Sequence, residues 1–82
     1  MTVSAYIFFT VDLGKTQDVI NALRAIPNIV NVAVVTGEYD IVTRIIVDDL
    51  EELFQVTTEH IHLIEGITET QTAVIEKEVL KE

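Results

Sequence analysis

The 82 residues are enough for one compact domain and too few for two. The chain has no cysteine, which excludes disulfides, thiolate metal sites and a cysteine nucleophile. Fourteen acidic residues and five scattered basic ones give a formal charge of −9, and direct nucleic-acid binding is not expected because it needs clustered Lys and Arg.

The N-terminal part of the chain predicts a strand followed by a helix. Apolar residues alternate along residues 3–11, and Tyr6 and Phe8 make the second face of this strand apolar too, which indicates a strand covered on both faces. Thr16 is the expected N-cap of the helix. Pro27 ends this helix, because the residue before a proline is pushed out of the α region.

The middle of the chain predicts a β-hairpin. Residues 29–36 are rich in valine and form the second expected strand. A tight connection over residues 36–40 leads into another apolar run, residues 41–47, which is the third expected strand. Two strands joined by so short a connection are expected to pair in an antiparallel manner.

The C-terminal half predicts a second helix and a fourth strand. Asp49 and Glu52 have the spacing of a capping box at the start of this helix, and Gly66 suits its C-terminus. The residues expected on the buried side of the helix are Leu50, Leu53, Phe54, Thr57, Ile61 and Ile64. Residues 67–80 favour a long last strand.

This β-α-β-β-α-β order predicts an α+β, ferredoxin-like fold, in which an antiparallel sheet carries both helices on one face. Right-handed crossovers place the two helices on the same side, so the other face needs a different cover. Hydrophobic residues make up 49% of the chain, which is more than one small core hides. We therefore expect a homo-oligomer in which two copies pack their open sheet faces together as a dimeric α+β barrel.

Three motifs suggest phosphate or metal binding, and each has a simpler explanation. Residues 14–16, Gly-Lys-Thr, resemble the end of a phosphate-binding loop, but Phe9 stands where that motif has its first glycine. His60 and His62 would point about 200° apart on a helix, which disfavours a shared metal. The acidic residues within 48–52 are explained by helix capping and the helix dipole. No catalytic residue, metal or cofactor is expected, and the chain is not expected to be an enzyme.

The strongest candidate for a ligand-binding site is the segment of residues 36–40, Thr-Gly-Glu-Tyr-Asp. Gly37 can adopt positive φ, Tyr39 offers a flat amphipathic surface, and the Asp40 carboxylate can meet an amino group. The alternative is an ordinary hairpin turn in which Asp40 bonds its own backbone. The last strand carries a threonine stripe that either contacts a ligand or merely suits a half-exposed strand; its members are Thr68, Thr70 and Thr72.

The segments IPNIVNVAVVTGEYDIVTRIIVDDLEELFQ and IEGITETQTAVI carry a resemblance to a known family. They resemble the effector-binding domain, called the RAM domain, of the Lrp/AsnC (feast/famine) transcription regulators. The resemblance extends over about residues 3–78. It implies a homodimer formed through the open sheet faces, rings of such dimers, and an amino-acid effector bound between dimers. The effector-binding residues that it implies are Thr36, Gly37, Glu38, Tyr39, Asp40, Thr70 and Thr72, with Asp40 on the α-amino group.

The sequence departs from the regulators at its N-terminus. They carry a helix-turn-helix domain there, whereas this sequence begins directly at the first strand, so we expect residues 1–82 to be a single stand-alone module. Such a module would regulate transcription indirectly, through self-assembly or co-assembly with full-length Lrp/AsnC regulators. It has neither a signal peptide nor a membrane-spanning run, so a cytoplasmic location is expected.

Two alternative functions share the expected topology. One is a small dimeric α+β-barrel enzyme of the monooxygenase or isomerase kind, which would need a His, Asn, Trp or Tyr directed into a pocket between helices and sheet. The other is an ACT-like regulatory domain, which would bind its ligand near the turn at residues 13–15, where the sequence offers one glycine.

Overall fold

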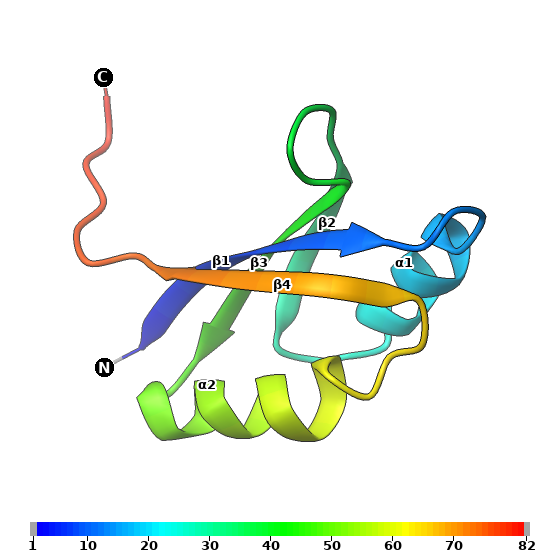
Figure 1. The fold of residues 1–82 in the computed structure, drawn as a ribbon. Helices are drawn as coiled ribbons and strands as arrows, with labels where there is room; N and C mark the ends of the chain where they lie inside the picture. The colour runs from blue at the N-terminus through cyan, green and yellow to red at the C-terminus, as the bar shows by residue number, and fades with distance from the viewer. Residues whose placement is uncertain (1, 82) are drawn as a thin grey trace.

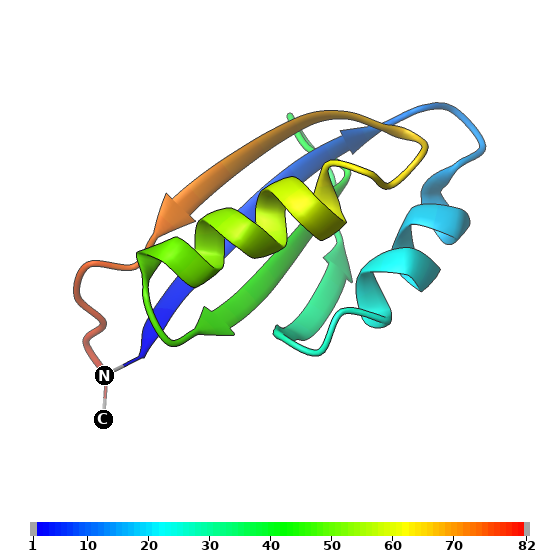
Figure 2. The same cartoon turned by 90° about the horizontal axis from the view of Figure 1, so that it is seen from below.

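The computed structural model describes residues 2–81, and it confirms the expected fold (Figure 1). The strands are β1 (Val3–Val11), β2 (Ile29–Val34), β3 (Ile41–Val47) and β4 (Ile67–Val74), and the helices are α1 (Thr16–Arg24) and α2 (Leu50–Val56). The strands form one antiparallel sheet in the order β2-β3-β1-β4. Both helices lie on the same face of this sheet, as Figure 2 shows.

The core lies between the helices and alternate residues of the two central strands. Ile7 pairs with Thr43 and Phe9 pairs with Ile41, and all four side chains point toward the helices and are buried. The buried hydrophobic residues are Ala5, Ile7, Phe9, Val19, Leu23, Ile26, Ile41, Ile45, Val47, Leu53, Val56 and Ile61. The alternation predicted for the first strand is therefore confirmed, and it fixes which face each strand turns to the helices.

The opposite side of the sheet has no helix over it in the described chain (Figures 1 and 2). We call this side the open face. It is defined by the register-matched residues Ser4, Tyr6 and Phe8 of β1, Val42, Arg44 and Ile46 of β3, Asn31 and Ala33 of β2, and Gln71 and Ala73 of β4. Tyr6 and Ile46 are among the exposed large hydrophobic residues. Apolar side chains are thus exposed on the side of the sheet that the helices leave uncovered.

Helix α1 begins one residue earlier than expected, at the residue that was expected to cap it. Thr16 is the first helical residue, and Lys15 occupies the N-cap position without a side-chain cap, so the prediction for Thr16 is wrong. The cause is a tight turn in which the Lys15 N–H donates to the Asp12 carbonyl at 3.0 Å. This turn places Lys15 directly before the helix. The helix ends at Arg24, ahead of Pro27 as expected.

Helix α2 starts with the expected capping box. The Asp49 carboxylate accepts from the Glu52 N–H at 2.8 Å, and Glu52 in turn accepts from the Asp48 N–H at 2.6 Å. Two orphan backbone donors are thereby satisfied by side chains that the sequence places three residues apart.

The end of this helix differs from the prediction. After Val56 the chain continues as a π-helical turn, η1 (Thr57–Ile61), closed by a 2.9 Å bond from the His62 N–H to the Thr57 carbonyl. The hydroxyl groups of Thr57 and Thr58 both donate to the Phe54 carbonyl, and side-chain bonds of this kind compete with the regular helical pattern. The uniform helical period assumed up to residue 64 is therefore wrong, and Leu50 and Phe54 are exposed.

Strands β2 and β4 are both shorter than expected. Strand β2 ends at Val34, because the Val35 N–H instead closes the following loop by donating to the Asp40 carbonyl at 2.9 Å. Strand β4 ends at Val74, not at residue 80. The chain then leaves the sheet on the side of the open face (Figure 1). Within residues 2–81 neither helix has the length and apolar character needed to cross a membrane.

Candidate functional site

The segment of residues 35–40 projects from the sheet on the side away from the helices (Figure 1). We call it the β2–β3 loop. Gly37 has φ of +115°, which confirms the expected left-handed conformation, and a Cβ atom added there would meet nothing within 4 Å. The loop therefore needs glycine for its backbone conformation and not for space. Thr36, Gly37 and Glu38 are exposed at its tip.

Asp40 fixes the base of this loop to the neighbouring strand. Its N–H donates to the Phe9 carbonyl at 2.8 Å, and its Oδ2 accepts from the Val11 N–H at 3.0 Å. The Asp40 side chain therefore bonds strand β1 and not its own backbone, which was the alternative. Strand β1 extends beyond the end of β3, and the Asp40 carboxylate takes the place of the missing backbone acceptor. Oδ1 accepts none of the hydrogen bonds identified within residues 2–81.

Tyr39 fixes the loop to the open face. Its ring lies 5.2 Å from that of Phe8, centroid to centroid, with the planes tilted by 41°. Its hydroxyl donates to the side-chain oxygen of Gln71 on β4. Tyr39 thus crosses over β1 and joins the loop to the edge strand. Sequence reasoning missed Gln71 as a partner of Tyr39, although the alternation of β4 put Gln71 on the face of the sheet that Thr70 and Thr72 do not share.

Thr70 and Thr72 lie on the other face of the sheet. Thr70 pairs with Phe9 and Thr72 pairs with Ile7, and both of those β1 residues point toward the helices. Within one chain the structure therefore does not bring these threonines together with Tyr39. Their role and that of the loop residues in binding an effector stay a prediction.

Thr68 does not share the face of the other two threonines. The register of β4 against β1 shifts between Thr10 and Val11, so that β4 carries one extra residue there. The Thr68 hydroxyl consequently bonds the Thr10 hydroxyl at 2.6 Å. The predicted three-residue stripe is interrupted by this β-bulge, which the sequence pattern did not indicate.

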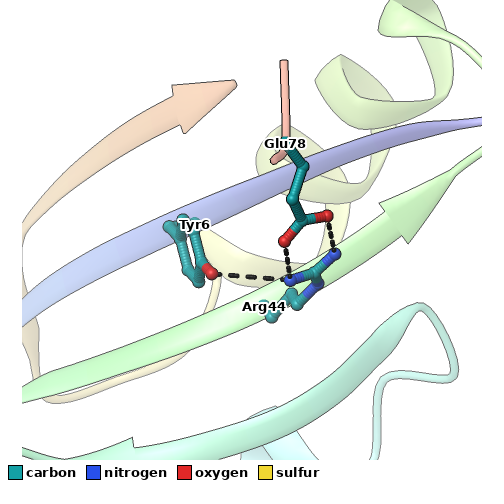
Figure 3. Close-up of polar contacts among 3 residues, drawn as sticks. All are labelled: Tyr6, Arg44 and Glu78. Atoms are coloured by element: carbon teal, nitrogen blue, oxygen red, sulfur yellow. Dashed lines mark hydrogen bonds and ion pairs between the residues drawn. The ribbon is translucent and has the colours of Figure 1, made fainter. Parts of the chain in front are cut away.

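A second polar cluster lies on the open face (Figure 3). Arg44 donates two hydrogen bonds of 3.1 Å to the carboxylate of Glu78, and a longer one of 3.4 Å to the Tyr6 hydroxyl. The hydrogen bonds and the charge of Arg44 hold the pKa of Glu78 below its ordinary value, and Glu78 raises the pKa of Arg44. Sequence reasoning missed this cluster, because no pattern linked residues so far apart.

The two histidines stay separate from these clusters. His60 lies in the π-helical turn and His62 directly after it, and both are exposed. Over residues 2–81, no group of three or more His, Cys, Asp or Glu side chains is arranged to hold a metal ion.

Comparison with known proteins places this geometry in a family. The family model for the Lrp/AsnC ligand binding domain matches residues 4–82. An uncharacterized HTH-type transcriptional regulator of Pyrococcus abyssi is 31% identical over 71 residues, which are 87% of this chain and 45% of that protein. The chain thus spans about half the length of the curated relatives that it matches.

Solved structures support the same assignment. The crystal structure of FFRP-DM1 has a TM-score of 0.85 at 34% identity, with 89% of this chain and 97% of that chain covered. The transcriptional regulator NMB0573 of Neisseria meningitidis, solved as an L-Met complex, has a TM-score of 0.89 at 18% identity, with 96% of this chain and 53% of that one covered, and it supports the fold alone. By sequence and by fold, the chain belongs to the Lrp/AsnC ligand-binding domain family.

Proposed function

We propose that this chain binds an amino acid and regulates transcription indirectly, through self-assembly or co-assembly with full-length regulators, and that it is not an enzyme. One observation carries the proposal: the β2–β3 loop is anchored at Asp40 and Tyr39 while its tip stays exposed. A loop fixed at its base and open at its tip is preorganised for a ligand. The L-Met complex of the Neisseria meningitidis regulator, a protein of the same fold, supports an amino acid as the ligand.

The chemistry of the loop suits both charged groups of an amino acid. Asp40 keeps Oδ1 available for an ammonium group while Oδ2 holds the loop. Backbone N–H groups at the exposed Gly37 and Glu38 suit a carboxylate, because a glycine at positive φ lets successive N–H groups converge. The side chain of the ligand would then lie outward, where another copy of the chain selects it.

The position of the threonines supports a site shared between copies. Thr70 and Thr72 face the helix side, whereas Tyr39 lies on the open face, so one copy cannot direct both sets at a single small ligand. A ligand that contacts both sets would lie where the loop of one copy meets the β4 edge of another. Pairing of open faces into a homodimer, followed by assembly of dimers into rings, provides such interfaces between copies.

The proposal is tested by calorimetric titration of the chain with each common amino acid, with the assembly mass followed by light scattering. The variant to use is Asp40→Asn, which keeps an oxygen acceptor for the Val11 N–H and removes only the charge. Asp18→Asn makes the same change at an exposed position on α1 and serves as the matched control.

Saturable binding that changes the mass, survives in Asp18→Asn and is lost in Asp40→Asn would support the amino-acid site. Failure of every amino acid to bind the unaltered chain would overturn the proposal. Binding that Asp40→Asn leaves unchanged would remove Asp40 from the site and keep the amino-acid function.

A further inference from the structure

The residues after β4 form a short arm that rises from the end of this strand on the side of the open face (Figure 1). Directly after β4, the Ile75 N–H donates a hydrogen bond to the carbonyl of Ser4 on β1, at 2.8 Å. Residues 76–81 are exposed and rise from the sheet on the side away from the helices (Figure 1). We call residues 75–81 the C-terminal arm.

One ion pair fixes the middle of the C-terminal arm. Figure 3 shows the Glu78 side chain pointing back to Arg44, which bonds it through both terminal nitrogens at 3.1 Å. The Arg44 guanidinium also lies 5.8 Å from the centre of the Tyr6 ring. Arg44, which also contacts Tyr6, therefore holds the arm at one point on the open face. This bidentate geometry sets a direction for the arm as well as a position.

The charges of the open face explain why this pair matters for association. Arg44 is the one basic residue within the four strands, and Val42 and Ile46 flank it on the same face. In a single copy the pair is exposed to solvent, with 25% of the Arg44 side chain and 49% of the Glu78 side chain accessible, and such pairs contribute little. A partner that packs on this face would exclude that solvent. Burying Arg44 without a counter-charge would then make the association less favourable.

Beyond the ion pair, the arm ends in two uncovered apolar side chains. Val79 and Leu80 are 76% and 86% exposed, and they directly follow Glu78, which the ion pair fixes to Arg44 on the open face. A molecule that covers the open face would therefore also lie next to Val79 and Leu80. The face is apolar and nearly neutral, because most of the acidic residues lie on helices and loops. It therefore suits a second copy of itself.

We propose that the C-terminal arm is an interaction element for a second copy of the chain. Glu78 neutralises Arg44 within the interface, and Val79 and Leu80 pack on the second copy. This inference rests on the dimer through the open face proposed above and adds the element that holds it.

The test measures the dimer dissociation constant of the full chain by sedimentation equilibrium. Glu78→Gln removes the counter-charge, and the double variant Val79→Ser with Leu80→Ser removes the apolar contacts. Glu76→Gln is the matched control, since it makes the same charge change in the same exposed arm, away from the ion pair with Arg44. Far-UV circular dichroism checks that each variant folds.

We expect Glu78→Gln and the serine variant each to weaken the dimer by roughly tenfold or more, because each change occurs in both copies. Glu76→Gln should stay within about twofold of the unaltered chain. An unchanged dissociation constant in the serine variant would overturn the inference, since the arm would then lie outside the interface. A tighter dimer in either variant would also overturn it, because the arm would then compete with the second copy.

The unaltered chain separates this failure from failure of the proposed function. If it dimerises and binds an amino acid while the arm variants behave like it, only the arm inference fails. If it stays monomeric at every concentration, both the dimer and the arm inference fail.

Discussion

Replacing Asp40 with alanine should destabilise the chain more than replacing it with asparagine. The Asp40→Ala variant leaves the Val11 N–H without its acceptor at a half-buried place on β1. A hydrogen bond to a charged group contributes about 1.5–3 kcal/mol, and partial exposure lets water recover some of it, so we expect a loss of about 1–2 kcal/mol. Asp40→Asn keeps a neutral acceptor, so we expect a loss of about 0.5–1 kcal/mol.

Urea unfolding at a fixed protein concentration measures both losses, and the fixed concentration keeps any assembly constant. Hydrogen exchange of the Val11 amide tests the cause directly. It should become fast in Asp40→Ala and stay slow in Asp40→Asn, because only the first variant frees that N–H. Equal losses in the two variants, with Val11 protected in both, would refute the assignment of Asp40 as the acceptor that closes β1.

Three further outcomes are expected. Gly66→Ala should cost more stability than Gly37→Ala in urea unfolding, by about 1–3 kcal/mol, because both have positive φ but a Cβ at Gly66 would lie 2.9 Å from the Lys15 Cβ. The contact of Glu78 should be lost as pH falls through its lowered pKa and kept above its ordinary pKa, which chemical shifts of the C-terminal arm would report, with Glu78→Gln showing no such transition. Tyr39→Phe should keep the ring contact with Phe8, lose the bond to Gln71 and cost about 0.5–1.5 kcal/mol in the same assay.

The fold was predictable because its signals are local. Alternation gave the faces of β1, the run of residues 41–47 matches β3 at both ends, and the spacing of Asp49 and Glu52 identified the start of α2. Each of these features depends on residues a few positions apart, for which period and capping chemistry suffice.

The features that escaped prediction depend on contacts between distant segments. Asp40 acts as an acceptor for the Val11 N–H because β1 extends beyond the end of β3. The partner of Tyr39 depends on the register of β4. The β-bulge near Thr68 changes which threonines share a face, and no local signal marks it. The candidate loop was therefore identified from sequence, whereas the face of each neighbouring side chain required the structure.

The π-helical turn after α2 is equivalent to one extra residue inserted in a regular helix. Buried Val56 and Ile61 are five positions apart, so the widened turn restores the face that an ordinary helix would have given to His60. Deleting one residue of this turn, such as Thr58, would leave Val56 and Ile61 four positions apart, as a regular helix requires. The turn is thus a place where the domain can change its length by one residue while keeping the same side chains in its core.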